Sequence, residues 1–176
     1  MNSLTTMTFI KGRPFYDMVM SFIAATVGLG PLFEPDNPSK LSAEQQAWYL
    51  GKVRPDIGID MGQVHRECIS GALSPTTAVK ALCCMLITGT YACAEGHNDH
   101  SPEFEFLRHL RNAAAHGNRF NFYPGEPRRP ASWSGCAIDH TLKGVANPLA
   151  NTECVGTFMS AGDVLTLLHD IEAKVP

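Results

Sequence analysis

The stretch SPEFEFLRHLRNAAAHGN, residues Ser101 to Asn118, decides the fold of this sequence and carries its most informative chemistry. Ser101 followed by Pro102 is typical of a helix start, because proline lacks a backbone N–H that the first helical turn leaves unbonded. Gly117 is typical of a helix stop, since glycine readily adopts the left-handed conformation found there. The stretch therefore predicts a helix from Pro102 to about His116.

This predicted helix has two opposite faces when it is drawn on a helical wheel. The apolar arc is rich in small residues and contains Phe106, Leu107, Leu110, Ala113, Ala114 and Gly117. The polar arc contains Arg108, His109, Arg111, Asn112 and His116. We expect the polar arc to face solvent, where guanidiniums suit phosphate oxygens and an imidazole can transfer protons. Asn112 lies one turn before His116, so its amide is expected to orient that imidazole.

The rest of the chain predicts an all-α bundle of about five helices in a single domain over residues 1–176. Helical patterns cover residues 15–27, 42–53, 63–73, 77–94 and 164–174. Capping signals support two of them, Ser42 with Gln45 and Ser160 with Asp163. The segment 118–158 contains prolines, glycines and short strand-like runs near 131–138, which predict a loop or hairpin insertion before the last helix. The apolar segment 77–94 is expected in the centre of the bundle.

Composition limits the classes of function. The chain has 176 residues, a net charge of −3, 18% charged residues and 44% hydrophobic residues. These values exclude a disordered chain and a generally basic nucleic-acid coat protein. Residues 103–129 nevertheless carry a charge of +2 while the remainder carries −5. Any binding of nucleic acid is therefore expected to be local to the segment that contains the Arg111–His116 helix.

The N-terminal region and the cysteines bear on cellular location. Lys11 and Arg13 precede an apolar run from Met18 to Leu32, which has the outline of a signal peptide. The run begins late and is shorter than the roughly 20 residues that span a bilayer, so we expect a buried first helix and no membrane partner. The six cysteines form no C-x-x-C pair, and we expect free thiols in the cytoplasm.

The segment from Arg111 to His116, RNAAAH, matches the arginine–x4–histidine form of the HEPN motif. The chain also resembles HEPN proteins in carrying this motif on the penultimate helix of a small helical bundle. Three strings resemble a plasmid- and phage-associated HEPN subfamily: FLRHLRNAAAHGN at 106–118, PRRPASW at 127–133 and GDVL at 162–165.

The resemblance implies a metal-independent endoribonuclease without a cofactor, often a toxin or defence factor, that forms a homodimer with a composite site. It implies that Arg111 holds the scissile phosphate, that His116 transfers protons, and that RNA and an antitoxin protein are candidate partners. We assign Asn112 to the positioning of His116. The wheel and the following loop add four candidate RNA-binding residues, Arg108, His109, Asn118 and Arg119.

Two alternatives stay open from the sequence, and a metal site is considered and not expected. The chain could be a non-catalytic HEPN module that binds RNA or a nucleotide, or a protein-interaction bundle whose polar arc is ordinary surface. A metal site at Cys93, His97 and His100 lacks the second ligand cluster that zinc sites usually have, so no metal is expected. Trp48, Tyr49 and Trp133 are expected to be packing residues.

Overall fold

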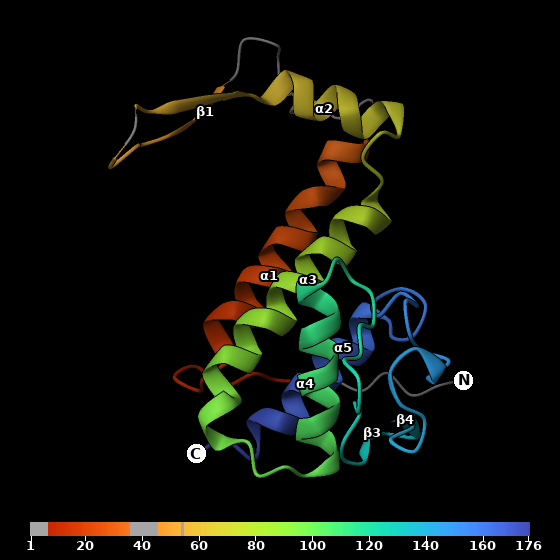
Figure 1. Cartoon of the computed structure of the whole chain (residues 1–176). Coiled ribbons are helices and arrows are strands. Elements are labelled where there is room, and N and C mark those ends of the chain that lie inside the picture. Colours follow the sequence, from red (N-terminus) through yellow and green to blue (C-terminus); the bar gives the residue numbers. More distant parts are fainter. Residues whose placement is uncertain (1–6, 36–45, 54) are drawn as a thin grey trace, which may run out of the picture. The chain divides into compact units, whose positions relative to one another are not determined.

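The computed structural model describes residues 7–35, 46–53 and 55–176 and is mostly helical (Figure 1). Its described part has five α-helices: α1 (Tyr16–Leu29), α2 (Met61–Ser70), α3 (Pro75–Ala94), α4 (Pro102–Ala115) and α5 (Ala161–Glu172). The chain divides into two compact units, a larger one formed by residues up to Ile23 together with Lys80–Pro176, and a smaller one formed by Ala24–Val79. The assignment of residues 1–176 to a single domain stays a prediction.

The core of the larger unit lies where α4 packs against α5 and against the strand β3 (Ala131–Trp133). Strand β3 pairs antiparallel with β4 (Cys136–Ile138), and Trp133 lies opposite Cys136. The indole N–H of Trp133 donates to a carboxylate oxygen of Asp170 over 2.9 Å, which joins this hairpin to α5. Side chains from α4 and α5 that are fully buried include Phe106, Leu107, Leu110, Leu167, Leu168 and Ile171. The packing role expected of Trp133 is thereby confirmed.

The predicted start and stop of the chemistry-bearing helix are confirmed, but the Ser101 side chain makes no capping hydrogen bond. Helix α4 begins at Pro102 and ends at Ala115, and Gly117 has a φ of 68°, the conformation that glycine permits at a helix end. Helix α5 has both hydrogen bonds of a capping box between Ser160 and Asp163. These local signals place His116 at the end of α4 rather than within it.

The insertion between α4 and α5 is irregular, as predicted, and contains the β3–β4 hairpin and a short 3-10 turn, η3 (Gly144–Ala146). Two backbone hydrogen bonds join its first residues, which follow α4, to a segment near its end. Phe120 N–H donates to Thr152 over 3.0 Å, and Asn151 N–H donates to Phe120 over 2.7 Å. The chain on both sides of this crossing is therefore held beside His116.

The smaller unit corrects one sequence expectation. Residues 46–49 form strand β1 (Gln46–Tyr49), which pairs antiparallel with β2 (Ile57–Asp60), so the helix predicted over 42–53 is wrong from Gln46 onward. The helix cap predicted at Ser42 with Gln45 lies outside the described residues. The neighbouring Trp48 and Tyr49 have a preference for strands, and pairing with β2 satisfies their backbone groups. Helix α2 begins after Asp60, whose carboxylate accepts the Gln63 N–H over 3.0 Å.

The two most apolar helices are less buried than the sequence predicts. Of α1 only Val19 and Phe22 are buried, and of α3 one face is buried while Met85 on the other is 71% exposed. By length and composition, the segments Tyr16–Phe33 and Pro75–His97 would each be able to cross a membrane. Core helices of soluble proteins and signal sequences share this length and composition. The expectation that both helices are core elements is wrong for their outward faces.

Candidate functional site

Arg111 is held against a fixed aromatic surface. Its guanidinium carbon lies 5.0 Å from the ring centroid of Tyr91 on α3, and Tyr91 is only 3% exposed. One N–H of Arg111 donates to the side-chain oxygen of Asn112 over 3.1 Å. Glu95 lies 3.9 Å away, at the outer limit of an ion pair. The guanidinium therefore has a defined orientation and, among the described residues, keeps most of its donors unbonded.

His116 is the residue that terminates α4. Its backbone N–H bonds to the carbonyls of Asn112 and Ala113, each over 3.1 Å, while its side chain is exposed. Within the described residues its imidazole has no hydrogen-bond partner. The Asn112 amide, which the sequence assigned to His116, instead accepts a hydrogen bond from Arg111. The structure therefore joins the Asn112 side chain to Arg111 and does not join it to the His116 imidazole.

Arg108 is neutralised inside the protein. Its guanidinium contacts a carboxylate oxygen of Glu105 over 3.0 Å and one of Glu126 over 3.2 Å. Burial lowers the pKa of Arg108, but the two carboxylates outweigh it and raise the pKa above its usual value. Burial likewise raises the pKa of Glu105, and the hydrogen bonds from Arg108 and His100 more than reverse that effect. The predicted pair of free guanidiniums at 108 and 111 is not formed.

His109 is in the core rather than on an exposed polar arc. It is 1% exposed, and its ring centroid lies 5.6 Å from that of Phe122 in the insertion. Burial, and then the neighbouring charge of Arg108, lower the pKa of His109 to about 4. The helical wheel misplaced this residue because it contains no information about the segment that covers α4. A neutral, enclosed His109 has no surface that an RNA strand could reach.

Asn118 and Arg119 have different surroundings. The Asn118 amide makes two hydrogen bonds to the backbone of Val155, donating to its carbonyl over 2.9 Å and accepting from its N–H over 2.8 Å. Arg119 is exposed and donates to the Asn151 carbonyl over 2.8 Å. Asn118 therefore fastens the insertion to the end of α4, and Arg119 remains accessible to an anion.

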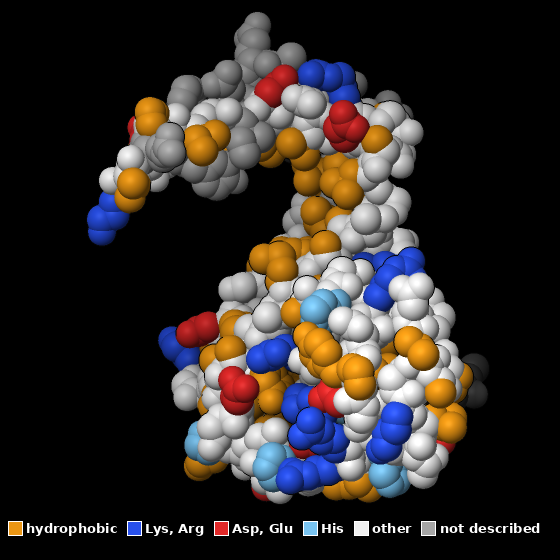
Figure 2. All heavy atoms as spheres, viewed as in Figure 1, with side chains coloured by type: hydrophobic (Ala, Val, Ile, Leu, Met, Phe, Trp, Pro, Cys, Tyr) orange, Lys and Arg blue, Asp and Glu red, His pale blue; other side chains and the backbone are white. Residues whose placement is uncertain are grey.

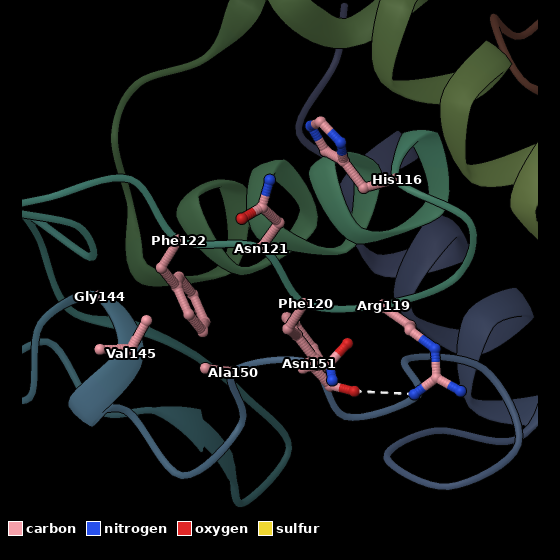
Figure 3. A pocket seen from close by; sticks show the side chains of 9 residues that line it. All are labelled: His116, Arg119, Phe120, Asn121, Phe122, Gly144, Val145, Ala150 and Asn151. Carbon is pink, nitrogen blue, oxygen red and sulfur yellow. Dashed lines mark hydrogen bonds between the residues drawn. The ribbon is translucent and has the colours of Figure 1, made fainter.

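A pocket of about 340 Å³ opens beside the end of α4 (Figure 3). His116 and Arg119 line it together with side chains from the insertion, among them Asn121, Phe122, Val145 and Asn151. Its lining comes from three segments of the chain: the end of α4 with the loop after it, the η3 turn, and residues 150–151. The sequence reasoning missed this pocket, because only the crossing of residues 120–122 with 150–151 creates it.

Basic side chains gather along α4, and those of Arg128 and Arg129 lie on the side of its first turn, the end opposite His116. Figure 2 shows Lys and Arg side chains over the face where Figure 1 places α4 and β3. Arg128 and Arg129 of the insertion are exposed, and Arg129 lies 3.9 Å from Glu105. The local positive charge read from the sequence at 103–129 therefore lies partly on the surface and partly in the buried Arg108 pairs.

The alternative metal site is not assembled. Among the residues that the structure describes, no three His, Cys, Asp or Glu side chains come together in a metal-binding arrangement. His100, one of the three candidate ligands, has its Nδ1 atom 3.1 Å from Glu105.

The sequence did not reveal the partners of the two arginines on α4, which are Glu105 for Arg108 and Tyr91 for Arg111. The spacing of three between Glu105 and Arg108 is a readable ion-pair signal, whereas nothing in the sequence links Tyr91 to Arg111.

Comparison with known proteins does not assign the chain to a family. No protein-family model matches the chain, and neither a curated protein nor a solved structure resembles it at a significant level.

Proposed function

We infer that this chain is a metal-independent endoribonuclease of HEPN type, acting as a toxin or defence factor. One observation carries the proposal: of the polar side chains near the end of α4, Arg111 and His116 keep accessible chemistry while Arg108 and His109 are taken up by internal partners. These two are the residues of the arginine–x4–histidine motif. The role of Arg119 is auxiliary, since it is an exposed cation beside His116.

The chemistry needs only these side chains and the RNA itself. The 2′-hydroxyl attacks the adjacent phosphorus, and the bond to the leaving 5′-oxygen breaks. His116 accepts the proton of the 2′-hydroxyl or donates one to the 5′-oxygen, and solvent water takes up or supplies the other proton. Arg111 binds the phosphate oxygens as their negative charge increases in the transition state. The products are a 2′,3′-cyclic phosphate and a free 5′-hydroxyl.

In this proposal, a second copy of the chain completes the catalytic site. Residues 111 and 116 are five apart, which on an α-helix is a rotation of about 140°. No hydrogen bond joins Arg111 to His116 within the described residues, and Arg111 does not line the pocket that His116 lines. We therefore propose that Arg111 of one protomer works with His116 of the other in a two-fold dimer.

The test is cleavage of a labelled single-stranded RNA by the purified chain in excess EDTA. Cleavage that continues in EDTA and yields 2′,3′-cyclic phosphate ends supports the proposal. Cleavage that stops in EDTA and returns with zinc or magnesium contradicts it. A DNA strand of the same sequence is the matched control, because it lacks the attacking hydroxyl.

A second candidate is a non-cleaving module that binds RNA or a nucleotide. One observation favours it: Asn112 is bonded to Arg111, so His116 has no neighbour among the described residues to fix its orientation. RNA binding without any cleavage, measured by fluorescence anisotropy on the same preparation, would support this function.

A further inference from the structure

The pocket beside His116 has the size of a site for one small ring system. At about 340 Å³ it lies at the lower end of the range for small-molecule sites, roughly 300–1,000 Å³. A folded polymer segment would not fit in it, whereas a single nucleotide unit would. It is also partly open to solvent, so a group that enters it can remain connected to a chain outside.

The lining combines flat apolar surface with amide groups. Val145 is 96% exposed on the η3 turn, which is unusual for an apolar side chain and leaves its whole surface available for contact. Phe122 also lines the pocket with the small part of its ring that is not buried, and its ring is stacked on Phe120, with centroids 5.9 Å apart and planes at 11°. Protein sites for unpaired bases use this pairing of an apolar or aromatic face with a polar edge.

The polar edge comes from Asn121. Its side chain is exposed, and among the described residues it makes no hydrogen bond. In Figure 3 it lies between His116 and Phe122. A carboxamide offers one acceptor and two donors, a set that matches the hydrogen-bonding edge of a nucleobase. Asn151 and Arg119 close the other end of the pocket, where the Asn151 carbonyl is already occupied by Arg119.

We propose that this pocket is a base-binding subsite for single-stranded RNA, and that it takes the base of the nucleotide on one side of the phosphate at His116. The inference rests on the proposed endoribonuclease function and deepens it. Val145 and Phe122 contact the base, Asn121 bonds its edge and selects it, and Arg119 binds the adjoining phosphate. The chain then cleaves RNA with a preference for one base at one of the two positions that flank the cut.

Two variants test the subsite, with a control matched in exposure. Val145→Trp fills the pocket, and Asn121→Ala removes its free amide. Val53→Trp is the control, because Val53 is 93% exposed and belongs to the smaller unit, whereas the residues that line the pocket belong to the larger one. Thermal unfolding of each variant is measured first, so that loss of folding is recognised.

The first readout is cleavage of an RNA library with all four bases at each flanking position. We expect the wild-type chain to prefer one base by on the order of tenfold. Asn121→Ala reduces that preference to less than about threefold, and Val145→Trp raises KM about tenfold with little change in kcat. Cleavage by the wild type without base preference, unaffected by Val145→Trp, overturns the subsite and leaves the nuclease proposal intact.

The second readout separates the two proposals when no RNA is cleaved. Binding of the four nucleoside 3′-monophosphates is measured by calorimetry at millimolar concentration. Binding that is lost in Val145→Trp and kept in Val53→Trp supports the subsite, even if the nuclease proposal has failed. No binding of any monophosphate by the wild type, together with absence of cleavage, overturns both.

Discussion

The guanidinium of Arg108 donates a hydrogen bond to Nε2 of His109, over 3.0 Å. A guanidinium has no acceptor, so Nε2 must be unprotonated and the imidazole proton resides on Nδ1. The same guanidinium is held by Glu105 and Glu126, and the His109 ring lies against Phe122. Two residues that look like an exposed RNA-binding pair in the sequence thus belong to one polar network, in which His109 is buried and Arg108 is partly buried.

The neutral state of His109 makes stability depend on pH. Its pKa is lowered to about 4 in the folded chain from the usual 6.5, so below pH 6.5 the unfolded chain binds a proton that the folded chain does not. The full contribution of His109 to the free energy of unfolding is present above pH 6.5. It is lost as the pH falls towards 4, by about 3 kcal/mol in total. Urea unfolding at pH 7.5, 6.0 and 5.0 measures the slope.

His109→Gln is the control for that slope, since its side-chain oxygen can accept the bond from Arg108 without titrating. The pKa of Glu105 is lowered in the folded chain, so its contribution to stability is lost only as the pH falls below the usual pKa of 4.5. Glu105 therefore does not affect the range from pH 6.5 to 5. An equally steep loss of stability in His109→Gln over that range would show that another group is responsible.

Arg108 and Arg119 are expected to differ in what they support. Arg108→Ala leaves Glu105 and Glu126 without their main partner and should lower the free energy of unfolding by about 3 kcal/mol. Arg119→Ala should change stability little, because Arg119 is exposed, but should weaken RNA binding and reduce its salt dependence by the equivalent of about one phosphate contact. Anisotropy titrations at several salt concentrations measure this, and an unchanged salt dependence in Arg119→Ala would remove that residue from the RNA surface.

Asn118 is expected to act through the fold. It has a φ of 63°, and its amide makes two hydrogen bonds to Val155. Asn118→Ala loses both bonds and places alanine in a left-handed conformation, so it should destabilise the chain by about 2–3 kcal/mol. Asn118→Gly loses the bonds without the strain and should be milder. Thermal unfolding compares them, and equal stability of Asn118→Ala and the wild type would contradict this role.

The sequence predicted the local features around α4 well. Pro102, Gly117 and the Ser160–Asp163 capping box act through bonds within a few residues, so their signals can be read without the fold. The hairpin near 131–138 was also predicted, and Ser134 and Gly135 form its turn with positive φ angles.

The sequence failed where partners come from far along the chain. His109 is enclosed by Phe122, Arg108 is neutralised in part by Glu126, and Asn118 is engaged by Val155, all from the insertion. A wheel of one helix shows which residues share a side but not what covers that side. The strand β1 was missed for a related reason, since its pairing with β2 overrides a weak helical pattern.

Mixing two inactive variants tests whether the site is shared between protomers. Arg111→Ala and His116→Ala are each expected to be inactive. If Arg111 and His116 act across a two-fold interface, half of randomly mixed dimers contain one intact site, and activity recovers to about a quarter of wild type. The variants are unfolded together, refolded and assayed on labelled RNA.

No recovery from mixed dimers, with dimer formation verified by light scattering, would mean that both residues act within one chain. A monomer at micromolar concentration would rule out the shared site altogether.

The most direct test of the account is the rate of RNA cleavage by His116→Ala, compared with wild type in EDTA. Removal of a general acid or base is expected to reduce the rate by on the order of 10²–10⁴-fold, and the exposed position of His116 should leave folding and RNA affinity nearly unchanged. The wild-type products should end in 2′,3′-cyclic phosphate, and a 2′-deoxy substitution at the cleaved position should block the reaction. Cleavage by a pure preparation of His116→Ala at the wild-type rate would contradict the mechanism.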